Sequence, residues 1–254
     1  MSKLKDKLLD NKLTYGSWLT LSSTAVAELM SACRKFDWLT VDMEHSAIEL
    51  KEAQELIRVI ELSGIVPLVR VGENDFNIIK RVMDAGAHGV IVPMVNSKED
   101  AEAAVAAVKY PPRGRRGVGL GRAQGYGFGF ENYKKWVDQE SIVIAQVEHI
   151  QAIENLEAIL NTTGVDGSII GPYDLSGSVG ALGEFNNPAV EEALKAYEHI
   201  CAALNKPMGA HVVQPNAGLV KSYLSKGYTL IAIGLDTLFL GSKIKEVFEE
   251  VKDN

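Results

Sequence analysis

Charged side chains directly follow apolar runs in two places along this chain. Asp42, Glu44 and His45 follow the run DWLTV, and Arg70 closes the run PLVR. Because an unpaired buried charge is costly, such residues at the end of a buried strand indicate either ion pairing or a site. Arg70 fits both interpretations: an ion pair with Asp42 or Glu44, or a clamp on a developing oxyanion or a substrate carboxylate. His45 is a candidate general base, since histidine titrates near neutral pH.

A second group of polar residues follows later apolar runs. Gln146 and Glu148 are two apart in SIVIAQVE, which places them on one face of a strand, and Asp174 follows GSIIGPY. Two carboxylates with open positions suit a hard divalent cation such as Mg²⁺, and a 2-oxo acid can chelate that cation through its carboxylate and ketone oxygens. The structural alternative pairs Glu148 with a lysine and makes Asp174 a turn cap. Trp18 and His211 end two further runs and add to the candidate site.

Eight short apolar runs alternate with segments of helical periodicity. The predicted strands are residues 13–19, 37–44, 65–71, 88–95, 141–148, 167–172, 206–213 and 229–235. Strands that are apolar on both faces indicate parallel pairing, and eight of them in 254 residues match the α/β class and a (β/α)8 TIM barrel. An open doubly wound sheet is the alternative, but no glycine-rich phosphate turn follows the first strand. Chemistry in such a barrel sits at the carboxyl ends of the strands, where all the residues above would lie.

The predicted helices have recognisable first residues, and the chain has no internal boundary. Ser22 or Ser23, Glu49, Asp75, Ser97 and Pro188 open helical segments. No linker, repeat or low-complexity tract divides the chain, so residues 1–254 are predicted to form one domain. The one long irregular stretch covers residues 110–130, a length that is typical of functional or mobile loops.

Composition limits the classes of partner and compartment. The net charge of −7 argues against nucleic acid and anionic membranes as partners. No apolar run is long enough to span a bilayer, and the first residues, MSKLKDKLLDNKL, lack the apolar core of a signal peptide. Two cysteines, Cys33 and Cys201, are typical of reduced thiols in a cytoplasmic protein.

Longer motifs extend the pattern over almost the whole chain. FDWLTVDMEHS, PLVRV, MDAGAHGVIVPMV, KYPPRGRRGVG, QVE and GVDGSIIGPYDLS occur in this order. Together they resemble the HpcH/HpaI aldolase family, the class II, metal-dependent 2-oxo acid aldolases. The resemblance implies a (β/α)8 barrel, usually hexameric, whose last helix is exchanged between subunits. It also implies reversible cleavage of a 4-hydroxy-2-oxo acid to pyruvate and an aldehyde through a metal-stabilised pyruvate enolate, with Mg²⁺, Mn²⁺ or Co²⁺.

The resemblance also implies roles for the oxo acid side of the site. Glu148 and Asp174 would be the metal ligands, and Gln146 would contact the bound oxo acid. The backbone at Gly171 and Pro172 would line the carboxylate of pyruvate.

The catalytic roles are implied in the same way. Arg70 would stabilise the enolate, and His45 would be the base. Asp84 matches the acid that strengthens this base in the family, but it follows a helix and so belongs nearer the opposite end of the barrel. Asp42 is the closer partner of His45 by chain position.

Two positions depart from the family pattern, and they leave the second half of the substrate open. Tyr173 stands where a small residue is common, and His211 stands where an apolar residue is usual. The alternative function is therefore another enolate-forming carbon–carbon lyase or synthase of the same barrel. A metal-free sensor of an acidic metabolite and a scaffold protein are the remaining alternatives, and the polar strand ends argue against both.

The last helical segment predicts an oligomer. Ile244, Val247, Phe248 and Val251 follow one another at helical spacing within residues 242–254, and this apolar face has to be covered. By resemblance the assembly is a homohexamer.

Overall fold

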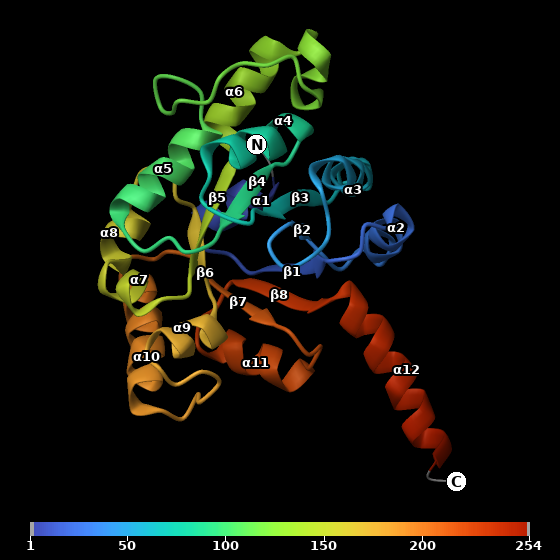
Figure 1. The fold of residues 1–254 in the computed structure, drawn as a ribbon, viewed down its shortest axis with the longest axis vertical. Helices are drawn as coiled ribbons and strands as arrows, with labels where there is room; N and C mark the ends of the chain where they lie inside the picture. The colour runs from blue at the N-terminus through green and yellow to red at the C-terminus, as the bar shows by residue number, and fades with distance from the viewer. Residues whose placement is uncertain (1–2, 253–254) are drawn as a thin grey trace.

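The computed structural model describes residues 3–252, which form a closed barrel of eight parallel strands in chain order (Figure 1). The strands are β1 (Thr14–Leu19), β2 (Trp38–Asp42), β3 (Val66–Arg70), β4 (Gly89–Val92), β5 (Ile142–Val147), β6 (Gly167–Ile170), β7 (Met208–Val212) and β8 (Leu230–Leu235). Each of the eight predicted strands is present. The predicted (β/α)8 barrel is confirmed, and the open sheet is excluded.

Side chains that alternate along the strands form two separate apolar clusters, as the two-residue period of a strand requires. Leu39 and Val41 of β2 belong to the cluster that includes residues of the surrounding helices, whereas Trp38 belongs to the cluster inside the barrel. Gly16 is required opposite Trp38, because a Cβ there would lie 2.1 Å from the indole ring. The inner series continues past this apolar layer to Asp42, so the same periodicity that fills the barrel points a carboxylate into its carboxyl end.

Helices surround the barrel, and most begin where the sequence predicts. They are α1 (Lys3–Leu9), α2 (Thr24–Ala32), α3 (Leu50–Leu62), α4 (Phe76–Ala85), α5 (Lys98–Val108), α6 (Phe130–Glu140), α7 (Ile150–Glu154), α8 (Leu156–Asn161), α9 (Pro172–Ser178), α10 (Pro188–Ala203), α11 (Ala217–Ser225) and α12 (Asp236–Lys252). The side chains of Ser23, Asp75 and Ser97 each accept a hydrogen bond from a backbone N–H of the first turn, and Glu49 forms a capping box with Glu52. The 110–130 stretch contains a 3₁₀ segment, η1 (Arg122–Gly127).

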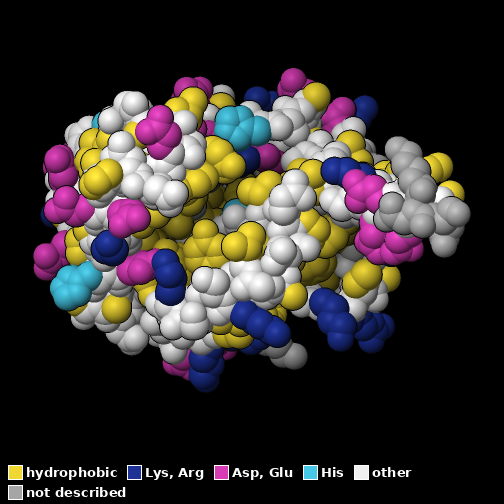
Figure 2. Space-filling model, turned by 90° about the horizontal axis from the view of Figure 1, so that it is seen from below, with side chains coloured by type: hydrophobic (Ala, Val, Ile, Leu, Met, Phe, Trp, Pro, Cys, Tyr) yellow, Lys and Arg dark blue, Asp and Glu magenta, His cyan; other side chains and the backbone are white. Residues whose placement is uncertain are grey.

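Helix α12 leaves the barrel and projects away from it (Figure 1). Large apolar side chains along it are exposed, namely Leu240, Ile244, Val247, Phe248 and Val251. Figure 2 views the molecule from the side of α11 and α12 and shows hydrophobic side chains lining a hollow in the middle of this face. Within residues 3–252, no helix is long and apolar enough to cross a membrane.

Candidate active site

Arg70 is the central charge at the carboxyl end of the barrel. It is the register partner of Asp42 on the neighbouring strand, and the two form a bidentate pair, with Nε 2.9 Å from Oδ1 and Nη2 2.6 Å from Oδ2. Its third nitrogen, Nη1, lies 3.2 Å from Oε2 of Glu44. The ion pairs anticipated as the structural alternative are thus both formed. These ion pairs hold the guanidinium in one orientation, and it remains at the mouth of the barrel.

Aromatic rings pack against this guanidinium. The Arg70 Cζ lies 4.4 Å from the centre of the Trp18 ring, and the Trp18 and His211 ring centres are 5.2 Å apart. Trp18 is buried and belongs to the inner cluster of the barrel. The predicted residues Trp18, Arg70 and His211, from three different strands, are therefore brought together.

Glu148 lies just past β5 and is buried, with 4% of its surface exposed. Its Oε1 accepts a hydrogen bond from the backbone N–H of Met94 at 2.7 Å, and its Oε2 accepts one from Nε2 of Gln146 at 2.5 Å. Met94 has φ of 51°, an uncommon left-handed conformation for a residue with a side chain. Glu148 is thus oriented by an amide and a strained main chain rather than by a lysine, so its structural alternative is not realised.

Asp174 lies in the first turn of α9 and is exposed. Burial raises the pKa of Glu148 above its ordinary value, and the negative charge of Asp174 adds to this effect. Two carboxylates that repel one another in this way fit a hard divalent cation, which relieves the repulsion and keeps water in its open positions. Among residues 3–252 no group of three or more His, Cys, Asp and Glu side chains could hold a metal ion, so any cation here would rest on these two acids with water or substrate.

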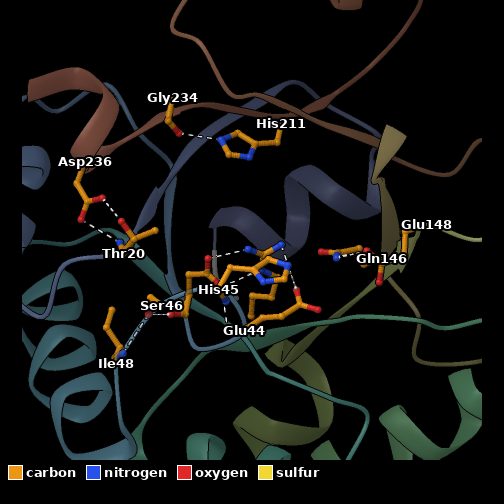
Figure 3. Close-up of polar contacts among 12 residues, drawn as sticks. Thr20, Glu44, His45, Ser46, Ile48, Gln146, Glu148, His211, Gly234 and Asp236 are labelled. Carbon is orange, nitrogen blue, oxygen red and sulfur yellow. Dashed lines mark hydrogen bonds and ion pairs between the residues drawn. The ribbon is translucent and has the colours of Figure 1, made fainter. Parts of the chain in front are cut away.

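His45 lies in the loop after β2, and its side chain is 68% exposed. Its Nε2 is 3.8 Å from Oε2 of Glu44, whereas Oδ1 of Asp42 accepts hydrogen bonds from the backbone N–H groups of both Glu44 and His45. Asp42 therefore positions the main chain of His45, and Glu44 is the acid beside its ring. Figure 3 shows His45 and Glu44 lying together at the centre of the group, with Gln146 and Glu148 to one side.

Comparison with known proteins gives the family. The sequence model of the HpcH/HpaI aldolase/citrate lyase family matches residues 14–241 of this chain. This chain belongs to the HpcH/HpaI family. The predicted family, and with it an enzyme of the aldolase class of lyases, is confirmed.

Individual relatives agree over nearly the full length. The chain is 37% identical to a 2-dehydro-3,6-dideoxy-6-sulfogluconate aldolase of Pseudomonas putida, over 93% of this chain and 92% of the relative. It is 34% identical to a hydroxypyruvate/pyruvate aldolase of Roseobacter denitrificans, over 94% of this chain and 93% of the relative. The crystal structure of an HpcH/HpaI aldolase/citrate lyase family protein from Burkholderia cenocepacia superimposes with a TM-score of 0.93 at 30% identity and covers 99% of this chain and 100% of its own.

Asp84 lies elsewhere in this HpcH/HpaI family chain. It is the next-to-last residue of α4, and its Oδ1 pairs with Nη2 of Arg116 at 2.6 Å. The same Arg116 nitrogen lies 3.1 Å from the hydroxyl of Tyr133. Since α4 runs back from the end of β3 to the start of β4, Asp84 is near the amino end of the barrel, as its chain position indicated. No contact joins Asp84 to His45 within the part of the chain that the structure describes.

Gly171, Pro172 and Tyr173 lie at the start of α9, beside Glu148. A Cβ at Gly171 would lie 3.0 Å from the Cβ of Glu148, so only glycine allows the backbone this close. The Tyr173 ring is exposed at the rim and meets Phe185 edge to face at 4.9 Å between centres.

The sequence left two interpretations of Glu44 open, an ion pair with Arg70 or membership of a site, and assigned it no catalytic role. Burial raises the pKa of Glu44, and the nearby charge of Glu148 acts in the same direction against the lowering effect of Arg70. Because buried acids with raised pKa values are frequent in active sites, Glu44 joins the candidate residues. Its spacing of two from Asp42 was the signal that could have identified it.

Proposed function

We propose that this HpcH/HpaI family protein is a divalent-metal-dependent aldolase that reversibly cleaves a 4-hydroxy-2-oxo acid to pyruvate and an aldehyde. The observation that carries the proposal is the buried, hydrogen-bonded Glu148 beside Asp174, within one barrel mouth that also holds Arg70. The relatives from Pseudomonas putida and Roseobacter denitrificans are both named aldolases, which supports the reaction class.

Glu148 and Asp174 would hold the cation, which we propose is Mg²⁺, Mn²⁺ or Co²⁺. When bound, such a cation supplies a Lewis acid for the ketone oxygen and stabilises negative charge there. Gln146 would contact the oxo acid, because its amide already lies against Glu148. The main chain of Gly171 and Pro172 would line the substrate carboxylate, since α9 begins at that point.

Arg70 stabilises the enolate that remains when the C3–C4 bond breaks. Its guanidinium is fixed by Asp42 and Glu44 before any substrate binds, so it does not have to reorient as negative charge develops. Trp18 covers part of the guanidinium and limits its contact with water, which strengthens its electrostatic effect.

His45 accepts the proton of the C4 hydroxyl in cleavage, and a proton delivered to C3 of the enolate then gives pyruvate; the aldol direction reverses both transfers. Glu44, 3.8 Å from Nε2 of His45, would stabilise the imidazolium formed by that transfer. Asp42 contributes by accepting a hydrogen bond from the backbone N–H of His45. Asp84 pairs with Arg116 instead and makes no direct contact with the His45 imidazole among the described residues.

The experiment that tests the proposal follows the methyl protons of pyruvate in D₂O without an aldehyde. The enzyme with added Mg²⁺, Mn²⁺ or Co²⁺ is expected to exchange them for deuterium, EDTA is expected to stop the exchange, and fresh metal is expected to restore it. Exchange that persists in EDTA, or metal-replete enzyme without exchange, would contradict the proposal. A parallel screen of aldehydes and oxo acids as acceptors separates the aldolase from the alternative enolate-forming lyase or synthase.

Tyr173 selects among acceptors rather than acting on pyruvate. Its exposed ring, which packs edge to face on Phe185, lies at the rim of the site in the first turn of α9. Tyr173→Ala is therefore expected to change the order of preference among aldehydes more than the exchange rate of pyruvate. An unchanged order would contradict this role.

The protein is proposed to act as a homo-oligomer, a hexamer by family resemblance, in the cytoplasm. The exposed apolar side chains of the projecting α12 need a partner surface, and an exchanged helix would supply one. Light scattering at micromolar concentration tests this, and a mass of 27.6 kDa, that of a single chain, would contradict it.

A further inference from the structure

His211 is held in one tautomer by the backbone of the next strand. It lies on β7, and its Nε2 is 2.9 Å from the carbonyl oxygen of Gly234 on β8. A carbonyl oxygen can only accept, so Nε2 carries the hydrogen and Nδ1 keeps a lone pair. The Ser17 hydroxyl lies 2.8 Å from the carbonyl oxygen of Ile233 and 3.2 Å from that of Gly234, so its one hydrogen is directed to this same stretch of β8 backbone.

The ring is also fixed in orientation and in charge. Trp18 packs against it at 5.2 Å between centres. Burial lowers the pKa of His211 to about 4, and the positive charge of Arg70 acts in the same direction. The imidazole is therefore neutral at physiological pH, and it is a hydrogen-bond acceptor at Nδ1 rather than a proton donor.

This acceptor has no protein partner and faces the site. Among the described residues, the side chain of His211 makes its hydrogen bond through Nε2 alone. Figure 3 shows Gly234 bonded to one side of the ring, while the other side is turned towards the region where His45 and Gln146 lie. The last inward-facing residue of β7 thus presents a hydrogen-bond acceptor without a protein partner, Nδ1 of His211, at the mouth of the barrel.

The geometry points to His211 as the acceptor of a hydrogen bond from a substrate hydroxyl, so that the enzyme selects hydroxylated substrates. The inference rests on the proposed aldolase function and names the substrate class of that site. A hydroxyl is the donor that fits, because hydroxyl groups are the hydrogen-bond donors that the oxo acid and aldehyde substrates of the proposed reaction carry. The hydroxyl belongs either to the aldehyde or to C3 of the oxo acid.

Two matched substrate pairs distinguish these sources. The first compares kcat/KM for glycolaldehyde and acetaldehyde with pyruvate as donor. The second compares hydroxypyruvate and pyruvate as donors with acetaldehyde. His211→Phe keeps a ring on Trp18 but removes both nitrogens, and it is expected to lower the preference for the hydroxylated member of one pair about tenfold, the effect of one lost hydrogen bond.

Two further variants guard against a general disturbance of the fold. Leucine and asparagine have nearly the same shape, but only the amide oxygen of asparagine can accept. His211→Asn is expected to retain part of the preference that His211→Leu loses. His199→Phe, the same substitution at an exposed position of α10, is the matched control and is expected to keep the preference of the wild-type enzyme.

The outcomes separate the inference from the proposed function. An active wild-type enzyme whose preference in both pairs is unchanged by His211→Phe and His211→Leu would overturn the role of His211 and leave the aldolase intact. A wild-type enzyme without pyruvate exchange and without aldol product would overturn both. Equal losses for both members of each pair would show that His211 supports the site only structurally and would also overturn the inference.

Discussion

The two ends of this barrel use the same residue types to opposite electrostatic effect. At the amino end, Glu61 contacts both Arg122 and Nε2 of His88, and the hydrogen bond from His88 together with the charge of Arg122 lowers the pKa of Glu61 to about 2. At the carboxyl end, burial raises the pKa values of Glu44 and Glu148. Both ends place acids beside arginine, but only at the amino end is each acid balanced by a basic partner.

The difference lies in the balance of charges. Around Arg70, the acids Asp42, Glu44 and Glu148 outnumber the one guanidinium, and Asp174 adds a further negative charge. Excess buried negative charge lowers the stability of the folded chain, and a bound cation of the kind proposed above would offset that cost. Unbalanced charge thus distinguishes a site from structural ion pairing here, where the residue types alone do not.

The largest expected effect removes one acid from the unbalanced end. Glu148→Gln is expected to lower the exchange of pyruvate protons in D₂O by about a thousandfold, because a neutral amide is a poor ligand for a hard cation whose stabilisation of charge amounts to several kcal/mol. Glu61→Gln, the same change at the balanced end, is expected to keep exchange within a few-fold of wild type. Equal losses in both variants would remove the distinction between the two ends.

At the amino end, removing a charged side chain is expected to lower the stability of the fold rather than the exchange rate. The Arg116 side chain is fully buried, pairs with Asp84 and packs on Tyr110 and Tyr133. Arg116→Ala is expected to lower the free energy of unfolding by about 3 kcal/mol, measured by urea denaturation, because it leaves its partners without a cation. Arg113→Ala, which breaks an exposed pair, is the control and is expected to cost under about 1 kcal/mol.

For Arg70, at the carboxyl end, the main expected loss is in the rate of pyruvate proton exchange rather than in stability. Arg70→Ala should lower the exchange rate about a hundredfold through loss of the oxyanion donor. Arg70→Lys should recover little of it, because an ammonium group cannot make the bidentate pair with Asp42. Arg58→Ala, on the outer helix α3, is the control, and a comparable loss there would contradict a local role for Arg70.

The smallest effect is a pH dependence of stability at Glu61. Its pKa in the folded state, about 2, is below its ordinary value of 4.5, so its stabilising contribution is complete above pH 4.5 and is lost as the pH falls towards 2. The side chain is 39% exposed, and solvent screening reduces the contribution to about 1 kcal/mol. The difference in unfolding free energy between wild type and Glu61→Gln should therefore narrow between pH 5 and pH 3. A difference that widens would contradict the assignment.

Local sequence patterns were sufficient for the elements and for the facing of their side chains. The alternation that fills the barrel with Trp38 also carries Asp42 into the mouth, and the spacing of Gln146 and Glu148 placed both on one face. Ser23 and Asp75 cap the helices that their positions predicted. These features depend on residues within a few positions of one another, where periodicity and capping chemistry operate.

Only the tertiary structure decided which charges meet. Asp236, the first residue of α12, directly follows β8 much as Asp174 follows β6, yet it accepts hydrogen bonds from the backbone of Thr20 and Leu21 and joins α12 to the segment after β1. Figure 3 shows it with Thr20, apart from Glu148.

The pairing of Asp84 with Arg116 and the tautomer of His211 depend in the same way on distances between residues far apart in the chain. The sequence by itself determined the barrel, the family and the set of polar residues at the strand ends. The closed sheet decided which of them stay unbalanced, because a strand's period sets the direction of a side chain, whereas its pKa and its partners depend on the neighbours that barrel closure brings within a few ångströms.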